Sequence, residues 1–340
     1  MDVSHRGNVV ALNDKLFFPK QITCPVCEKP FMRFALRKTQ FSISKRDFDY
    51  RPLYLGQINP RLFAICVCPH CFYAGEDKFF CPRMSEDDLR RKEYFQSHKA
   101  QWEAQNRVRA ASSGQQIWKD QAAEKLKEIA ADELAILRRI SPLLQKSATN
   151  IIAKGKPYNE LQRDGDLDAA VRSYELAAIC YKARRANHRI LGYTYLNGAW
   201  ASRDAAELTT DEAKKKDYRD FEAAYLREAV NFLTITNKAT SIEDQYMPDG
   251  SRIPKENMPE SRIFEIMYIL AGAHRKLGDI ESSNKFLEQI IYGASGAQGI
   301  MLWFVNQARE MRQSENEFVS TTEDNVPQDE NPEPSDDEEQ

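Results

Sequence analysis

Two pairs of cysteines are the residues of this sequence whose spacing most clearly indicates chemistry. Cys24 and Cys27 lie in CPVC, Cys68 and Cys71 lie in CPHC, and forty residues separate the two C-x-x-C pairs. A C-x-x-C turn presents two sulfurs to one ion, and zinc prefers four such ligands at tetrahedral corners. The doubled spacing therefore predicts one Zn²⁺ site with these four cysteines as ligands. Four thiolates close the coordination sphere, so the predicted role is structural.

A disulfide framework and a redox pair are the competing interpretations of these cysteines. Disulfides need an oxidising compartment, and residues 1–20 lack the basic, apolar and small-residue order of a secretory signal. A thioredoxin-like motif needs one C-x-x-C near a βαβ unit, whereas this sequence has two matched pairs. The zinc interpretation is therefore favoured.

Three further residues near the pairs could ligate metal. Cys66 lies two positions before Cys68 and could exchange with it, but a packed strand residue is the favoured interpretation. Cys81 is interpreted as a cysteine outside the site. His70 is interpreted as a turn residue, because four sulfurs already complete the shell.

The residues between the pairs predict short strands over 31–36, 41–43 and 62–67. Basic and aromatic residues alternate in this stretch, and the basic ones are Arg33, Arg37, Lys38, Lys45, Arg46, Arg51 and Arg61. Cations neutralise phosphates and aromatic rings stack on bases, which fits single-stranded nucleic acid. A small β-domain whose aromatic residues form the core and whose charges face water is the favoured alternative. In RDFDYR, over 46–51, opposite charges can pair along one strand face.

Several sequence features of residues 22–80 match a known pattern. They are CPVC followed by Phe31, the segment RDFDY-x-x-x-Y-x-G-x-x-NP, and VCPHC-x-YA ending at Tyr73-Ala74. In these features the chain resembles a bacterial family catalogued as domain of unknown function 2225 (DUF2225). The family usually has glycine after the second cysteine of each pair, where this chain has Glu28 and Phe72. The resemblance implies a cytoplasmic bacterial protein with a tetratricopeptide-like C-terminal half, and it transfers no catalytic residue.

From Ser85 onward the pattern predicts helices. A polar helix is expected to follow Ser85, and a second over 115–140 to end where Ser141-Pro142 disturbs it. The segments 165–170 and 278–283 match each other, with a Gly-Asp pair followed by small and apolar residues at the spacing of a tetratricopeptide second helix. A repeat array with a concave surface for partner proteins is favoured over a helical bundle without a groove.

The charge of the chain is uneven. The formal net charge is −3, yet residues 313–340 hold eleven acidic residues and no Lys or Arg, so the rest carries +8. This tail, with three prolines, is predicted to be disordered. Its simplest role is solubility. The sharper hypothesis is that it folds back on the basic residues 20–83, whose surplus is +6, and competes with an anionic partner.

The remaining composition is that of a globular chain, with 42% hydrophobic and 29% charged residues and no apolar run long enough to span a bilayer. No phosphate loop, dinucleotide fingerprint, nucleophile elbow or His-Glu metal helix is present, so we expect no enzymatic activity. The predicted organisation is an extension (1–19), a small β zinc ribbon (20–84), a long-helix connector (85–148), an all-α tetratricopeptide-like domain (149–312) and the tail (313–340). The predicted function is a cytoplasmic zinc-binding adaptor for partner proteins, with nucleic-acid binding as the alternative.

Overall fold

Short antiparallel strands form the N-terminal part of the protein. The computed structural model describes residues 16–37, 41–55, 59–82, 131–240, 258–293 and 299–323, apart from the side chains of residues 78, 81, 82, 131, 132 and 314–323. Within these ranges the strands are β1 (Phe17–Thr23), β2 (Pro30–Leu36), β3 (Ser42–Arg46), β4 (Pro52–Leu55), β5 (Ile65–Val67), β6 (Ala74–Glu76) and β7 (Cys81–Pro82). They make three small sheets, in the orders β2-β1-β7, β3-β4 and β5-β6.

The register of the first sheet follows from its alternating pattern. Phe17 pairs with Leu36 and Thr23 with Pro30, so β1 and β2 form one antiparallel hairpin. In β2, Phe31 is buried and Met32 is 41% exposed, which is the period of two that a sheet with one covered face requires. Because β1 begins at Phe17, the first sheet includes residues that the sequence placed in an N-terminal extension.

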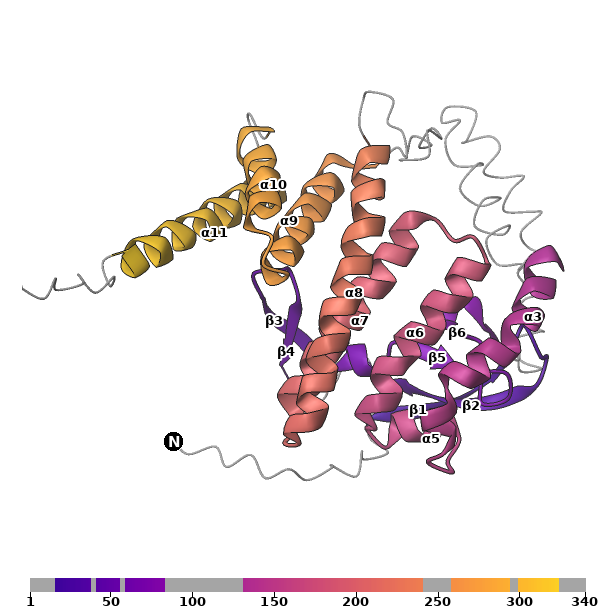
Figure 1. The fold of residues 1–340 in the computed structure, drawn as a ribbon. Coiled ribbons are helices and arrows are strands. Elements are labelled where there is room, and N and C mark those ends of the chain that lie inside the picture. Colours follow the sequence, from indigo (N-terminus) through magenta and orange to yellow (C-terminus); the bar gives the residue numbers. More distant parts are fainter. Residues whose placement is uncertain are drawn as a thin grey trace, which may run out of the picture.

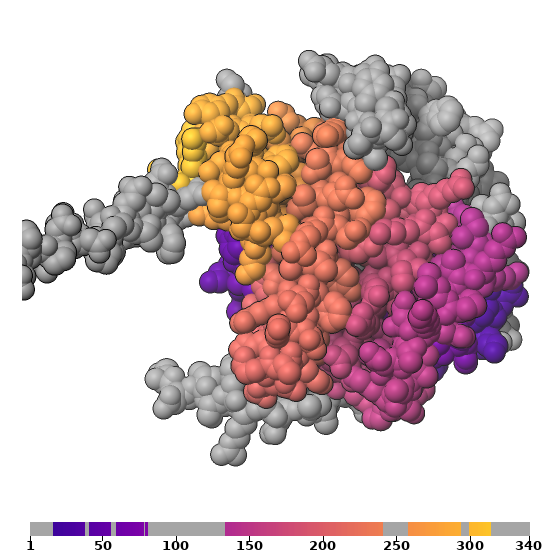
Figure 2. Space-filling view, in the orientation of Figure 1, coloured from indigo at the N-terminus to yellow at the C-terminus, as the bar shows by residue number. Residues whose placement is uncertain are grey.

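From residue 131 onward the described chain is mainly helical (Figure 1). They are α3 (Ala131–Ser147), α4 (Thr149–Ile152), α5 (Tyr158–Arg163), α6 (Leu167–Ala183), α7 (His188–Leu208), α8 (Glu212–Ala239), α9 (Glu260–Lys276), α10 (Ile280–Gly293) and α11 (Ile300–Glu323). In the space-filling view the helices form the face toward the reader, and the strands show at its edges (Figure 2). The predicted fold class, a small β module followed by an all-α region, is confirmed. No described helix is long and apolar enough to cross a membrane.

The two matched Gly-Asp segments adopt the same local structure. Gly165 and Gly278 have positive φ angles of 78° and 82°, which end α5 and α9 without the steric cost that a side chain would add. The next residue caps the following helix, because Asp166 accepts a hydrogen bond from the Ala169 N–H at 2.9 Å and Asp279 accepts one from the Ser282 N–H at 3.0 Å. The predicted glycine turn between paired helices is therefore confirmed at both positions.

Three buried clusters run through the molecule. The first joins the strands to α3, α5 and α6, the second joins α6 to α9, and the third joins α9, α10 and α11. Cys24 of the strand region and Leu137 of α3 lie in the same cluster. The predicted ribbon and the helices after it thus share an interior. The boundaries assigned from the sequence at residues 84 and 148 stay predictions.

Two helix ends differ from the sequence expectation. α3 continues through Pro142 to Ser147, although a helix was expected to end near Ile140. Proline removes one backbone donor, but Leu137 and Leu144 on either side are each 1% exposed, so their burial holds the helix together. α11 runs to Glu323, beyond the expected start of a disordered tail at residue 313, because no Gly or Pro interrupts the chain before Pro327. The helix expected after Ser85 and the tail after Glu323 lie outside the described residues.

Candidate metal centre

Each cysteine pair is the turn of an antiparallel hairpin. Cys24 and Cys27 lie between β1 and β2, and Cys68 and Cys71 lie between β5 and β6. The backbone bonds correspond, because the N–H four residues after the first cysteine donates to its carbonyl, at 2.9 Å in the first turn and 3.0 Å in the second. The sequence Cys-Pro-x-Cys therefore folds twice into the same turn.

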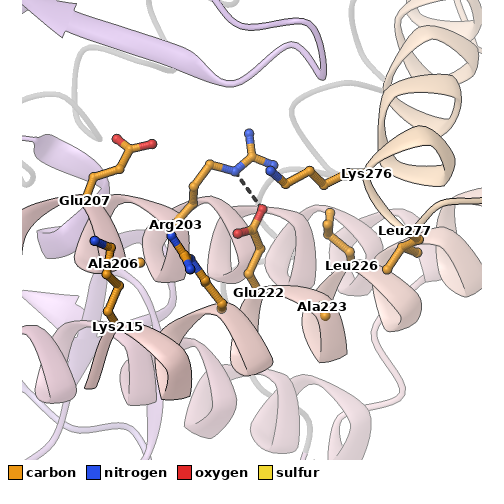
Figure 3. A pocket seen from close by; sticks show the side chains of 10 residues that line it. Arg203, Ala206, Glu207, Lys215, Glu222, Ala223, Leu226, Lys276 and Leu277 are labelled. Atoms are coloured by element: carbon orange, nitrogen blue, oxygen red, sulfur yellow. Dashed lines mark hydrogen bonds and ion pairs between the residues drawn. The ribbon is translucent and has the colours of Figure 1, made fainter. Parts of the chain in front are cut away.

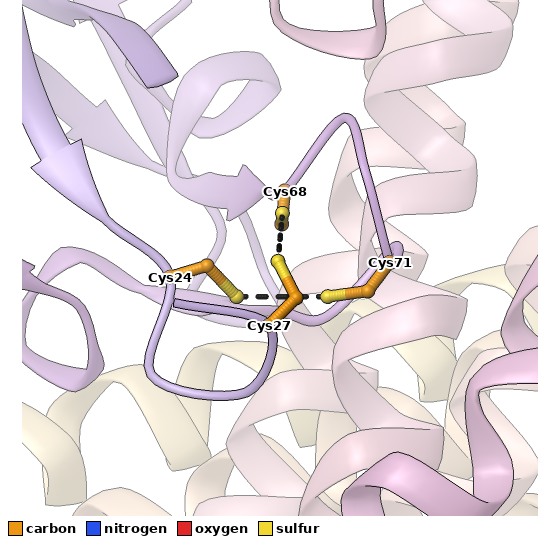
Figure 4. Close-up of side chains that lie close together, drawn as sticks. All are labelled: Cys24, Cys27, Cys68 and Cys71. Carbon is orange, nitrogen blue, oxygen red and sulfur yellow. Dashed lines mark hydrogen bonds between the residues drawn. The ribbon is translucent and has the colours of Figure 1, made fainter. Parts of the chain in front are cut away.

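The two turns bring the four sulfurs together (Figure 4). Their Sγ atoms all lie within 4.8 Å of one another, with Cys24 and Cys71 3.5 Å apart and Cys27 and Cys68 3.6 Å apart. In a tetrahedral site with zinc–sulfur distances of about 2.3 Å, neighbouring sulfurs are about 3.8 Å apart. The four predicted ligands thus meet, and the donor set fits a tetrahedral thiolate site.

Backbone N–H groups support the sulfurs from inside each turn. The Val26 N–H donates to the Cys24 Sγ and the His70 N–H donates to the Cys68 Sγ, both at 3.4 Å. Such outer hydrogen bonds stabilise negative charge on a ligand sulfur and fix its direction. His70 therefore contributes to the centre through its backbone, in agreement with its interpretation as a turn residue.

Hydrogen bonds among the cysteines shift the pKa values of Cys24 and Cys71 in opposite directions. Hydrogen bonds from the Cys24 and Cys68 thiols lower the pKa of Cys71 to about 5, because they stabilise its thiolate. The hydrogen bonds that Cys24 makes to Cys68 and Cys71 raise the pKa of Cys24, because they require it to keep its proton. A cation that binds the four sulfurs would displace the protons that the thiols hold.

Cys66 and Cys180, which lie outside the cluster, have packing roles. Cys66 is 1% exposed in β5 and borders a small cavity with Arg33 and Phe63, and burial raises its pKa to about 12. Its interpretation as a packed strand residue is confirmed. The Cys180 sulfur on α6 accepts the Ala74 N–H at 3.4 Å, just beyond the second turn. The backbone of Cys81 pairs with Thr23, and its side chain lies outside the described part.

Helices α3 and α6 hold both turns from the helical side. Arg138 donates from Nε to the Val26 carbonyl at 3.1 Å, and Ser141 donates from Oγ to the Cys71 carbonyl at 3.5 Å. Arg184, which directly follows α6, donates to the Tyr73 hydroxyl at 3.3 Å. The position of the cysteine cluster is thus coupled to the helical region.

Comparison with known protein families covers both regions. A family model described as an uncharacterized protein conserved in bacteria (DUF2225) matches residues 17–128 and 130–314. The chain belongs to the DUF2225 family. The match includes the strands, the four cysteines and nearly all of the helical region, which confirms the resemblance stated for residues 22–80. No curated protein and no solved structure matches the chain.

At two positions where the DUF2225 family usually has glycine, this protein has a residue with a side chain, and the backbone there is left-handed. Glu28 has a φ of 61° and Phe72 a φ of 60°, and each directly follows the second cysteine of a pair. A side chain in this conformation costs about 1 kcal/mol relative to glycine. The turn geometry therefore persists without glycine, at an energetic cost.

Replacing Glu28 with glycine is expected to raise the free energy of unfolding by about 0.5–1 kcal/mol. The change relieves the left-handed strain. It loses only the ion pair between Glu28 and Arg138, whose side chains are 75% and 57% exposed. Urea denaturation would measure the gain. The control Glu28→Ala loses the same ion pair but keeps a Cβ, so equal stability of the two variants would contradict the strain.

A second group of charged residues lies at the tip of the β3–β4 hairpin. The turn is closed by hydrogen bonds from the Asp47 N–H to the Arg51 carbonyl at 2.8 Å and from the Tyr50 N–H to the Asp47 carbonyl at 2.9 Å. Arg51 also donates to the Asp47 carboxylate at 3.1 Å. The pairing of opposite charges expected in RDFDYR is present here, although the turn and not a strand face provides it.

Asp49 at this tip is fully buried against the helices. Its carboxylate accepts hydrogen bonds from Arg203 of α7 at 2.7 Å and from the Trp200 indole at 3.0 Å. Arg203 also donates to Glu222 of α8 at 2.6 Å. The tip of the hairpin is therefore joined to two helices through one buried guanidinium.

Two further arginines enter the same network. Arg51 donates to Asp204 at 2.8 Å and to Glu207 at 2.9 Å, and Arg61 donates to the second Asp204 oxygen. Burial raises the pKa of Asp204, and the two arginines oppose that rise. These contacts fix the segment between the two cysteine pairs against α7.

Gly272 of α9 allows the hairpin tip to approach a helix backbone. A Cβ on this residue would lie 2.6 Å from the Asp49 Cα and 2.8 Å from its Cβ. Beside it, the Tyr50 ring packs on Tyr268 and Phe304, with ring centroids 6.2 and 5.5 Å away. The docking of the hairpin on α9 thus requires glycine at this position.

Gly272→Ala is expected to lower the free energy of unfolding by about 1–3 kcal/mol, because two backbones must separate to admit one methyl group. Thermal and urea denaturation would show the change. The matched control is Gly293→Ala, because nothing lies within 4 Å of a Cβ at that glycine. If Gly272→Ala lowers the free energy of unfolding no more than Gly293→Ala does, the close approach of the hairpin tip to the α9 backbone is contradicted.

Three of the basic residues between the two cysteine pairs are buried, and two of them contact the helices. Arg33, Arg51 and Arg61 are 8%, 5% and 4% exposed, so these three cations are buried. The expectation that the charges of this stretch face water is therefore wrong for them, because carboxylates and carbonyls of other segments pair with them in the interior. Arg33 pairs with Asp77 and donates to the Phe63 carbonyl. Arg51 and Arg61 pair with Asp204 of α7, which the sequence did not identify as a site residue. The available signal was the charged pair Arg203-Asp204 between alanines in a helix otherwise patterned for burial.

Proposed function

We propose that this DUF2225 protein is a non-enzymatic scaffold that a structural zinc ion stabilises and whose helical region docks partner proteins. The observation that carries the proposal is the set of four converging sulfurs, of which Cys24 and Cys68 are 0% exposed. Four thiolates leave no coordination position for water or substrate. Zinc bound here would contribute folding energy by tying the two hairpins together.

The order of the helices supports a docking role. Each long helix from α6 to α11 packs against the next one in sequence, and the matched turns at Gly165 and Gly278 start α6 and α10 in the same way. Stacked helix pairs of this kind bury a continuous core and leave extended surfaces on which proteins bind. We therefore assign the partner to the helical region and the metal to the strand region.

Metal analysis combined with cross-linking tests the proposal. The purified protein is expected to contain one zinc ion per chain, and a lysine-reactive cross-linker added to native cells is expected to join it to a protein partner. Lysines on both regions can report the contact, for example Lys182, Lys214 and Lys276 on helices and Lys20 and Lys29 near the first cysteine pair. Cross-links confined to the strand region, or co-purified nucleic acid with a salt-dependent affinity, would contradict the proposal and favour the nucleic-acid alternative.

A further inference from the structure

A cavity of about 360 Å³ lies between α7, α8 and the end of α9 (Figure 3). None of the residues that line it belongs to the cysteine cluster. A volume of this size suits a small molecule. Its apolar walls come from Ala206, Ala223, Leu226 and Leu277. Its charged walls come from Arg203, Glu207, Lys215, Arg219, Glu222 and Lys276.

Both acidic residues of the cavity are already paired with arginines. Glu222 accepts from Arg203 at 2.6 Å, and Glu207 accepts from Arg51 of the hairpin at 2.9 Å. Arg219 and Lys276 have no carboxylate partner among the described residues. The cavity therefore presents cations that its own acids do not neutralise.

Arg203 on the cavity wall keeps hydrogen-bonding capacity although its side chain is only 6% exposed. A guanidinium has five N–H donors, and those of Arg203 reach Asp47 at 3.3 Å, Asp49 at 2.7 Å and Glu222 at 2.6 Å. One N–H on each terminal nitrogen is left. Lys276 extends from α9 toward this guanidinium (Figure 3), so two cationic groups face the same space.

From these contacts we propose that the cavity binds a small phosphorylated ligand. A phosphate monoester carries close to two negative charges at neutral pH and three acceptor oxygens, so donors on α7, α8 and α9 can each reach one. A carboxylate offers one charge and two coplanar oxygens, which match this arrangement less well. The proposal goes beyond the scaffold function, because the cavity shares no residue with the cysteine cluster.

The competing explanation is charge balance within the protein. The ion-pair network beside the cavity has five carboxylates, on Asp47, Asp49, Asp204, Glu207 and Glu222, and three arginines. Lys215, Arg219 and Lys276 could simply offset the excess negative charge. The two explanations differ in one outcome, because only the first requires phosphate to bind.

Calorimetric titration of the intact protein with inorganic phosphate and with ribose 5-phosphate, at constant ionic strength, tests the proposal. Binding is expected, and the double variant Arg219→Gln/Lys276→Gln is expected to weaken it at least tenfold. Both residues are exposed, so the variant should fold normally, which circular dichroism would verify. Lys216→Gln/Arg227→Gln, which removes two exposed cations of α8 outside the cavity, is the matched control and should retain the affinity.

Three results would overturn the assignment. They are the absence of binding at millimolar phosphate, an equal loss of affinity in the control variant, and citrate binding as tightly as ribose 5-phosphate. The first would leave charge balance as the role of these cations. The second would mean that phosphate affinity depends only on the overall charge of the protein. The third would make carboxylates, and not phosphates, the ligand class of the cavity.

Discussion

Cys68→Ser is expected to abolish stoichiometric metal binding and to lower the free energy of unfolding by at least about 3 kcal/mol. The serine hydroxyl is a poor zinc ligand, and the three remaining sulfurs cannot close a tetrahedron. In small domains a bound structural zinc contributes about 10 kcal/mol or more to folding, which is comparable to the whole stability of an ordinary domain. Because the cluster lies in the core shared by the strands, α3 and α6, the loss should extend beyond the turn itself.

Metal content by mass spectrometry and urea denaturation of the same preparations would measure this effect. Cys66→Ala is the matched control, because it removes a buried thiol two residues away that lies outside the cluster. It is expected to keep one zinc per chain while losing some packing energy. A Cys68→Ser protein that stays as stable as the wild type, or a reduced wild type that is metal-free and fully folded, would contradict the structural role.

Arg203→Met is expected to lower the free energy of unfolding by about 3–5 kcal/mol, the cost of leaving buried charges without a partner. Methionine fills much of the volume but donates no hydrogen bond. Asp49, which is 0% exposed, would keep two neutral donors, the Trp200 indole and the Arg51 backbone N–H. Glu222 would lose its close cation. The hairpin tip would then be held to α7 through Arg51 and through the bond from Trp200 to Asp49.

Urea denaturation with Arg227→Met as control would test this expectation, because Arg227 is an exposed arginine on the neighbouring helix α8. The control should change the stability by less than about 0.5 kcal/mol. A loss below about 1 kcal/mol in Arg203→Met would show that the network contributes little to stability and mainly sets the position of the hairpin.

Features that depend on residues close together in sequence could be predicted from the sequence. The two Cys-Pro-x-Cys turns form because neighbouring residues set the backbone, and the four sulfurs of the two turns meet in one cluster as their spacing predicts. The Gly-Asp turns at Gly165 and Gly278 follow for the same reason, since only local dihedral angles and one capping side chain are involved. Even the left-handed positions of Glu28 and Phe72 were marked by the glycines usual in the family.

The roles of charges could not be predicted in this way. In sequence, Arg51 and Arg61 look like members of a basic face, and only the fold places both on Asp204, 153 and 143 residues away. A charge can be buried only where distant segments supply its partner, so its location depends on how the hairpin meets α7, α8 and α9. Local chemistry therefore determined the cysteine turns and the helix starts, whereas tertiary packing decided which cations are buried and which face the cavity beside α9.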